Sequence, residues 1–270
     1  MGGLDGLLTV EPARWCFRTA RRRSGHGWLE SAFVASSTRA YSFSYRFIAA
    51  VVRPFLWLIS KKDWRGLENL DRSEGFIVAA NHMSNLDPLC TAHVLYNNGA
   101  PPRIMAKAEL FKVPGLGALL RSSGQIPVDR KSRSAAESLS AAADALRSGE
   151  CVLIFPEGTL TLDPELWPMV AKTGVARLAL MSGAPVIPMA QWGAHTLLPR
   201  RSFWLRPIPR KRVRAILGPP VDLSDLGTNT DPATLVEATA RIMAAITALV
   251  AELRGEQPPA EPFDRRKEGV

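Results

Sequence analysis

Short apolar runs alternate with helical patterns along most of the chain, and this alternation limits the fold more than any other feature. The runs are apolar on both faces, which is typical of strands buried between helices. They cover residues 75–80, 103–106, 124–128, 151–155, 185–190 and 213–218. Segments 134–147 and 235–253 place apolar residues at helical spacing. The sequence therefore predicts an α/β fold with a mostly parallel sheet flanked by helices.

Composition and cysteine use agree with a globular domain in a reducing compartment. Hydrophobic residues make up 46% of the 270 residues and charged residues 22%, which argues against disorder of the whole chain. The cysteines are Cys16, Cys90 and Cys151. Their odd number excludes a disulfide framework, and the lack of a CxxC pair argues against a structural zinc site.

The net charge of +9 is concentrated in two segments. Residues 1–65 hold 11 basic and 4 acidic side chains, and residues 198–214 hold 7 basic and no acidic ones. Residues 66–197, in contrast, are nearly neutral. The pattern predicts an enzyme-like body flanked by two segments suited to an anionic surface.

The first of these segments divides into an arm and an apolar stretch. The opening residues lack a basic region followed by a long apolar core, so no signal peptide is expected, and residues 1–30 are predicted as a basic mobile arm. From Tyr41 the chain is apolar and aromatic, with Arg46 and Arg53 embedded. A helix over residues 47–59 would rise only about 20 Å, against about 30 Å for a bilayer core. We expect residues 31–65 to form a helical segment that lies in the membrane interface; a helix of the protein core is the alternative.

The second basic segment interleaves its cations with Phe203, Trp204 and Leu205. Basic residues are attracted to anionic lipids, and aromatic residues suit the membrane interface. A solvated loop beside a strand would have the same composition. No helix-turn-helix, RNP or zinc-finger pattern accompanies the cations, so a membrane surface is expected rather than nucleic acid.

A candidate catalytic pair follows the apolar run 75–80. The sequence there reads Asn81-His82-Met83-Ser84-Asn85-Leu86-Asp87-Pro88, and ligand sites of open α/β sheets lie at the carboxyl ends of strands. In one interpretation Asp87 only caps the helix that begins at Pro88. In the other, Asp87 accepts the Nδ1–H of His82 and leaves Nε2 as a general base.

Three further blocks decide between these interpretations. They are Gly124-Gln125-Ile126-Pro127-Val128-Asp129-Arg130, Phe155-Pro156-Glu157-Gly158-Thr159 and Val186-Ile187-Pro188-Met189-Ala190. Together with the NHx4D pattern of His82 and Asp87, they resemble the four ordered motifs of the 1-acyl-sn-glycerol-3-phosphate acyltransferase family, in the glycerolipid acyltransferase superfamily. Lys107-Ala108-Glu109-Leu110 is similar to that family's K-x-E-L segment. The resemblance extends from about residue 40 to residue 220.

The resemblance implies transfer of a long-chain acyl group from acyl-CoA or acyl carrier protein to the free hydroxyl of 1-acylglycerol 3-phosphate, giving phosphatidic acid. His82 and Asp87 would be catalytic, without an acyl-enzyme, and no cofactor or metal is expected. The implied substrate-binding residues are Arg130, Lys107, Glu157, Gly158, Thr159 and Lys172. Arginine commonly follows FPEGT in the family, whereas this chain has Leu160.

These expectations combine into one organisation. An acyltransferase domain occupies residues 66–254, and residues 255–270, which are rich in proline and charge, are predicted as a disordered tail. We expect a monotopic or peripheral protein on the cytoplasmic face of the cell membrane. An acyltransferase with another acceptor, such as glycerol 3-phosphate, another lysolipid or a glycolipid, and a non-catalytic scaffold that binds anionic lipid are the alternatives.

Overall fold

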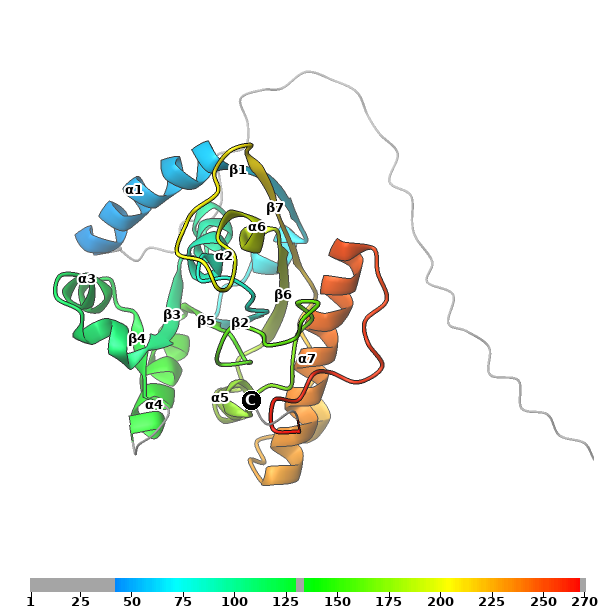
Figure 1. Cartoon of the computed structure of the whole chain (residues 1–270). Helices are drawn as coiled ribbons and strands as arrows, with labels where there is room; N and C mark the ends of the chain where they lie inside the picture. The colour runs from blue at the N-terminus through cyan, green and yellow to red at the C-terminus, as the bar shows by residue number, and fades with distance from the viewer. Residues whose placement is uncertain (1–41, 130–133, 268–270) are drawn as a thin grey trace, which may run out of the picture. The chain divides into compact units, whose positions relative to one another are not determined.

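A seven-stranded sheet in the order β1-β7-β6-β2-β5-β3-β4 forms the centre of the computed structural model, which describes residues 42–129 and 134–267 (Figure 1). The strands are β1 (Ser60–Arg65), β2 (Phe76–Ala80), β3 (Pro102–Lys107), β4 (Ile126–Val128), β5 (Cys151–Ile154), β6 (Val186–Trp192) and β7 (Lys211–Leu217). Each strand but β1 overlaps one of the predicted apolar runs.

Neighbouring strands run parallel except β6 and β7, which pair antiparallel. This confirms the prediction of a mostly parallel sheet. At the centre, Ala79 of β2 is in register with Ile154 of β5, and Ala80 is in register with Met189 of β6. The carboxyl ends of β2, β5 and β3 therefore meet at one edge, which we call the carboxyl edge.

Helices cover both faces of the sheet. They are α1 (Phe43–Ile59), α2 (Asp87–Asn97), α3 (Leu116–Ser122), α4 (Ser134–Arg147), α5 (Gly174–Ser182), α6 (Ala194–Leu197) and α7 (Pro232–Arg254), with 3-10 turns η1 (Leu67–Leu70), η2 (Ala108–Lys112) and η3 (Ser224–Leu226). Ile77 and Ala79 of β2 pack with residues of α4, α5 and α7, whereas Val78 and Ala80 pack on the opposite side with residues of α2. This alternation buries both faces of β2, which explains its continuous apolar sequence.

Helix α1 packs one side against the body and leaves an apolar stripe exposed. Ser42 caps its N-terminus by accepting the N–H of Tyr45, and buried Leu56 and Ile59 hold its end. The exposed stripe consists of Phe43, Phe47, Val51, Phe55, Trp57 and Leu58. These residues lie on one side of the helix because they recur at helical spacing. The predicted mobile arm, residues 1–30, lies outside the described residues.

Strand β1 differs from the sequence expectation. Residues 60–65 were expected at the end of the membrane-associating segment, but they form a strand that pairs parallel with β7 from Ser60 to Arg65. Because β1 is an edge strand with exposed lysines and no apolar run, its sequence does not resemble the buried strands. The sheet thus begins before residue 66, the predicted start of the acyltransferase domain.

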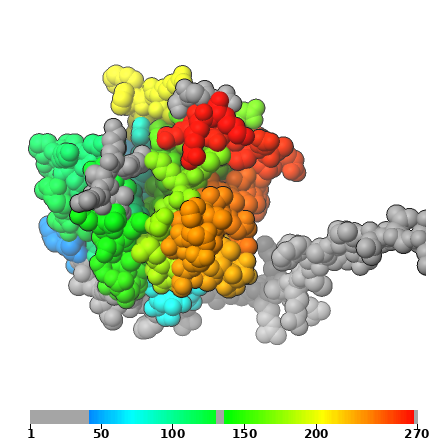
Figure 2. Space-filling model, turned by 90° about the horizontal axis from the view of Figure 1, so that it is seen from below, coloured from blue at the N-terminus to red at the C-terminus, as the bar shows by residue number. Residues whose placement is uncertain are grey.

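The C-terminal part of the chain lies against the segment after β5. In the described part of the chain, α7 is the one helix long and apolar enough to cross a membrane. Its apolar side packs in the core through Leu235, Ile242 and Val250, among others. Residues 255–267, predicted as a disordered tail, follow α7 and are red in Figure 2. The N–H of Val170 donates to the C=O of Phe263 in this segment.

Candidate active site

The turn between β2 and α2 brings His82 and Asp87 together at the carboxyl edge. His82 Nδ1 lies 3.0 Å from Asp87 Oδ2. The same carboxylate oxygen accepts the N–H of Met83 at 2.6 Å and the N–H of Ser84 at 2.7 Å. Asp87 therefore faces back across the turn rather than capping α2, and its carboxylate fixes both the turn and the imidazole.

The side chains of His82 and Asp87 differ in exposure. Asp87 is fully buried, whereas the side chain of His82 is 15% exposed. With Nδ1 directed at the carboxylate, Nε2 is the ring nitrogen left for a reacting group. The imidazole stacks on the ring of Phe155, with centroids 4.4 Å apart and planes at 28°. Phe155 directly follows β5, so two adjacent strand ends set the orientation of the ring.

Glu157 is a buried residue whose carboxyl group bonds to the backbone of the site. Its side chain is 2% exposed, and Oε1 accepts the N–H of His82 at 2.9 Å while Oε2 accepts the N–H of Met169 at 3.2 Å. The C=O of His82 in turn accepts the N–H of Thr161 at 2.6 Å. The carboxylate predicted to bind substrate thus bonds to backbone groups, and it joins the His82 turn to the segment that follows β5.

Burial raises the pKa of Glu157 to about 8, and the hydrogen bonds from the backbone of His82 and Met169 oppose that effect only in part. The nearby charge of Asp87 adds to the increase. Desolvation is the dominant cause because a carboxylate loses its hydration when it is enclosed.

Side-chain amides join the ends of β2 and β6 next to the His82–Asp87 turn. Asn81 Nδ2 donates to the C=O of Gln191, and Asn81 Oδ1 accepts the N–H of Gln191 at 2.8 Å. Gln191 Nε2 donates to the C=O of Asn81 at 3.0 Å. These bonds extend the pairing of the two strands by one residue, which gives Asn81 of the Asn81-His82 pattern a structural role. The role of Gln191 has no signal in the sequence.

The predicted phosphate-binding residues border the same edge. Lys107 ends β3 and is exposed, with Nζ 3.8 Å from Glu109 Oε1. Gly158 has a φ of +71°, and a Cβ placed there would lie 3.4 Å from Lys172 Cδ, so Lys172 packs against the Glu157–Gly158–Thr159 turn. Thr159 is half-buried. Arg130 lies outside the described residues.

Burial also shifts the pKa values of titratable groups outside the His82–Asp87 pair. His195 Nδ1 lies 2.8 Å from Met83 Sδ, and burial lowers the pKa of His195. His93 is buried in α2 and packs edge-on against Trp64; burial, with Lys62 and Arg53 nearby, lowers its pKa to about 4. Cys151 begins β5 and is buried, which raises the pKa of its thiol.

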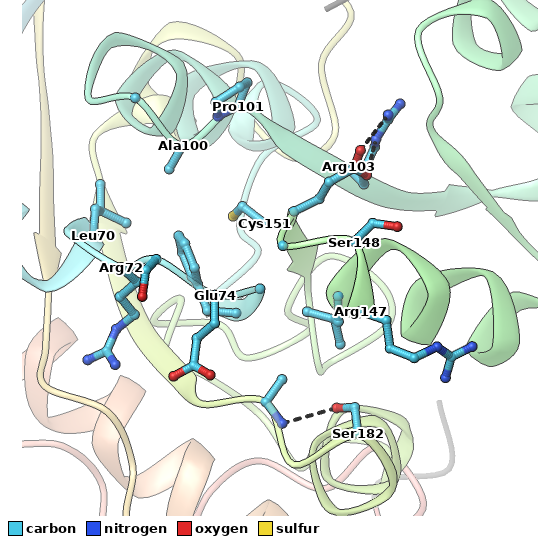
Figure 3. Close-up of a pocket in the computed structure, with 18 of the residues that line it drawn as sticks. Leu70, Arg72, Glu74, Ala100, Pro101, Arg103, Arg147, Ser148, Cys151 and Ser182 are labelled. Atoms are coloured by element: carbon cyan, nitrogen blue, oxygen red, sulfur yellow. Dashed lines mark hydrogen bonds and ion pairs between the residues drawn. The ribbon is translucent and has the colours of Figure 1, made fainter. Parts of the chain in front are cut away.

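A cavity of about 760 Å³ lies at the opposite edge of the sheet, where β2, β3 and β5 begin (Figure 3). Cys151 lines it together with Leu70, and Arg103 on its wall pairs with Glu150, with Nε 2.7 Å from Oε2. Volume alone would make it a candidate site. His82 and Asp87 are absent from its lining, so this cavity is separate from the acid–base pair.

Comparisons with known proteins connect this arrangement to acyl transfer. A family model described as Acyltransferase matches residues 62–192, which include the His82–Asp87 turn and the segment after β5. The chain is 31% identical to a 1-acyl-sn-glycerol-3-phosphate acyltransferase of Bacillus subtilis over 151 residues, which is 55% of this chain and 71% of that protein.

Two further relatives carry the same description. The chain is 30% identical over 163 residues to the chloroplastic 1-acyl-sn-glycerol-3-phosphate acyltransferase BAT2 of Brassica napus and 31% identical over 154 residues to the enzyme of Borreliella burgdorferi. These matches cover 60% and 56% of this chain, and 45% and 60% of those relatives. The match therefore spans less than two thirds of either relative.

The fold matches a solved structure over most of its length. The crystal structure of the 1-acyl-sn-glycerophosphate (LPA) acyltransferase PlsC from Thermotoga maritima superposes with a TM-score of 0.60 and 25% sequence identity. The match covers 80% of this chain and 83% of that one. The similarity thus extends beyond the residues that the family model covers.

Proposed function

The chain belongs to the 1-acyl-sn-glycerol-3-phosphate acyltransferase family, and from this premise we propose that it transfers a long-chain acyl group from a thioester to the free hydroxyl of 1-acylglycerol 3-phosphate. The product would be phosphatidic acid, and the donor would be acyl-CoA or acyl carrier protein. The observation that carries the proposal is the His82–Asp87 pair at the carboxyl edge, with Nδ1 bound to a fully buried carboxylate and the ring partly exposed.

The pair supports a general-base mechanism without an acyl-enzyme. Nε2 of His82 takes the proton of the acceptor hydroxyl while that oxygen attacks the thioester carbonyl carbon. The tetrahedral intermediate then expels the thiolate, which takes the proton back from the imidazolium, so the products are an ester and a free thiol. Asp87 stabilises the imidazolium and keeps the proton on Nδ1. General-base assistance of this kind contributes about 10²–10⁴-fold to the rate.

The residues around the His82–Asp87 pair hold it in position. Glu157 anchors the N–H of His82, and Phe155 restricts the ring to one plane. Such support matters because a catalytic base must hold its geometry before the substrate arrives. Glu157 therefore acts as a positioning residue, and backbone N–H groups supply the charge stabilisation for the oxyanion.

The acceptor phosphate requires cations at the carboxyl edge. Lys107 at the end of β3 and Lys172 beside Gly158 come from different segments at the carboxyl edge, and we include Arg130 on the sequence resemblance. A phosphate monoester is bound most strongly by charge-assisted hydrogen bonds from such side chains. Gly158 and Thr159 complete the proposed acceptor site.

We further propose that the protein binds the cytoplasmic face of an anionic membrane through α1 and the loop 198–210. Phe203, Trp204 and Ile208 of that loop are exposed by 95%, 84% and 87%. Arg210 fastens the loop to α1, since Nη2 donates to the C=O of Trp57 at 2.5 Å and to the C=O of Ser60 at 2.7 Å. The two apolar surfaces are thus joined and surrounded by arginines, which suits an interface with anionic lipids.

An acceptor and donor panel tests the proposed reaction. Purified protein in lipid vesicles is given long-chain acyl-CoA or acyl carrier protein with 1-acylglycerol 3-phosphate, other lysophospholipids, a glycolipid or glycerol 3-phosphate, and the products are identified by mass. We expect acylation of 1-acylglycerol 3-phosphate to be fastest. Preference for another acceptor would replace the proposed substrate, and no transfer with any pair would contradict the proposed activity.

A further inference from the structure

The segment after α6 brings an arginine to the catalytic turn from a distant part of the sequence. Ser84 Oγ in the His82–Asp87 turn donates to the C=O of Leu198 at 2.7 Å. The C=O of Leu197 accepts the N–H of Arg206 at 2.7 Å, which closes the chain between them into a loop. Arg200, two residues after Leu198, is therefore held beside the carboxyl edge.

The guanidinium of Arg200 reaches the backbone that contacts the catalytic histidine. Its Nη1 donates to the C=O of Thr161, and a second carbonyl, that of Asp163, lies 3.4 Å away. The N–H of the same Thr161 donates to the C=O of His82 at 2.6 Å. Thr161 therefore links the guanidinium of Arg200 to the backbone of His82 through two hydrogen bonds.

The charge of Arg200 is not neutralised by these contacts. Both acceptors are neutral carbonyl groups, and no carboxylate within residues 42–129 and 134–267 forms an ion pair with Arg200. In this part of the chain only Nη1 is engaged, so Nε and Nη2 keep their N–H donors for a ligand. The residue is half-buried, and partial burial strengthens its attraction for an anion.

We propose that Arg200 binds the phosphate monoester of the acyl acceptor and selects acceptors that carry one; this rests on the function proposed above. The two carbonyl contacts hold the planar guanidinium in place, and its remaining edge presents parallel N–H groups that match two phosphate oxygens. Leu160, directly before Thr161, provides no charge at this turn. Arg200 supplies that charge from the segment after α6.

The alternative role for Arg200 is a clamp that only holds the segment 161–163. Arg200→Gln separates the two roles because its amide N–H₂ can donate to a carbonyl but carries no charge. Arg200→Lys keeps the positive charge but lacks the planar pair of parallel N–H donors that a guanidinium presents. Arg121→Gln is the matched control, since Arg121 is exposed and its guanidinium also donates to a backbone carbonyl, that of Phe111.

Steady-state kinetics with 1-acylglycerol 3-phosphate and with 1-acylglycerol, which lacks the phosphate, form the first test. For Arg200→Gln we expect KM for the phosphorylated acceptor to rise about 10- to 100-fold, the loss typical of a charged hydrogen-bond partner. We expect kcat and donor KM to stay within about twofold, Arg200→Lys to recover part of the loss and Arg121→Gln to match the wild type. An equal loss with both acceptors would show a clamp and overturn the proposal.

Binding of glycerol 3-phosphate, measured by calorimetry on the full chain, separates this proposal from the proposed reaction. Binding by the wild type and by Arg121→Gln, with loss of binding in Arg200→Gln, would support the phosphate site even if no acyl transfer were found. Equal binding by the wild type and Arg200→Gln, or no binding by the wild type, would overturn it.

Discussion

At the scale of single residues, the proposed general-base mechanism depends on the buried carboxylate of Asp87. One carboxylate oxygen receives three contacts, from His82 Nδ1 and from the N–H groups of Met83 and Ser84. The amide oxygen of Asp87→Asn can occupy that position and keep the turn, but it brings no charge. We expect kcat to fall about 10²- to 10⁴-fold while the circular dichroism spectrum stays unchanged. A folded Asp87→Asn enzyme with wild-type kcat would limit Asp87 to holding the turn.

Glu157 leads to a pH prediction at the same scale. Its folded pKa is raised to about 8 from an ordinary value of 4.5, so between these values the folded protein keeps a proton that the unfolded chain has lost. The free energy of unfolding therefore decreases as pH rises through this window. Glu157→Gln cannot titrate and should lack this decrease, which for the wild type amounts to a few kcal/mol between about pH 5 and about pH 8.

Urea denaturation at several pH values measures this difference. Glu137→Gln, which changes an exposed carboxylate of α4, is the control and should follow the wild type. Parallel pH profiles for the wild type and Glu157→Gln would mean that burial does not raise the pKa of Glu157 in the folded protein.

Some residues of the site could be predicted and others could not, for physical reasons. His82 and Asp87 lie five residues apart in one turn, so the sequence suffices to pair them. The sequence predicts that Glu157 contacts substrate, whereas the structure buries it. A carboxylate in a turn after a strand carries no signal in the sequence that it will be buried. Gln191 of β6 and Arg200 of the segment after α6 follow His82 by more than 100 residues, and a single sequence carries no signal for such contacts.

At the scale of elements, helix α1 is predicted to drive membrane binding. Phe47 and Phe55 lie in its exposed stripe, 53% and 42% exposed. The double variant Phe47→Ser/Phe55→Ser removes apolar area that would enter the interface, and we expect its partition onto anionic vesicles to fall at least about tenfold. Val236→Ser, which changes an exposed valine of α7, is the control. Sedimentation with vesicles measures the binding of the wild type and of both variants. Equal binding by all three proteins would contradict the prediction that α1 drives membrane binding.

Element boundaries show where periodicity is informative. The buried strands and α4 were predictable because their apolar patterns are continuous or helical. Strand β1 was not, because Ser60–Arg65 is polar and pairs with β7, about 150 residues later in the sequence. Its place in the sheet depends on that partner rather than on its own residues.

At the scale of the whole molecule, the sheet organises two edges with different roles. The carboxyl edge combines the His82–Asp87 pair proposed for catalysis, Glu157, which anchors the N–H of His82, and the proposed phosphate-binding residues. The opposite edge holds a cavity of about 760 Å³ whose lining does not include that pair. An α/β fold predicts this division, because the ends of parallel strands collect at one edge the loops that carry function. The sequence could therefore predict the location of the site better than the contacts within it.

The most direct test of the central claim is the rate of phosphatidic acid formation from long-chain acyl-CoA and 1-acylglycerol 3-phosphate by the wild type and by His82→Ala. His26→Ala, which changes a histidine outside the described residues, serves as the control. Vesicle binding and thermal unfolding confirm that each protein is folded. We expect turnover by the wild type and by His26→Ala, and a loss of at least about 10²-fold in His82→Ala. A folded, membrane-bound His82→Ala protein that retains the wild-type rate would contradict the assignment of His82 as the catalytic base.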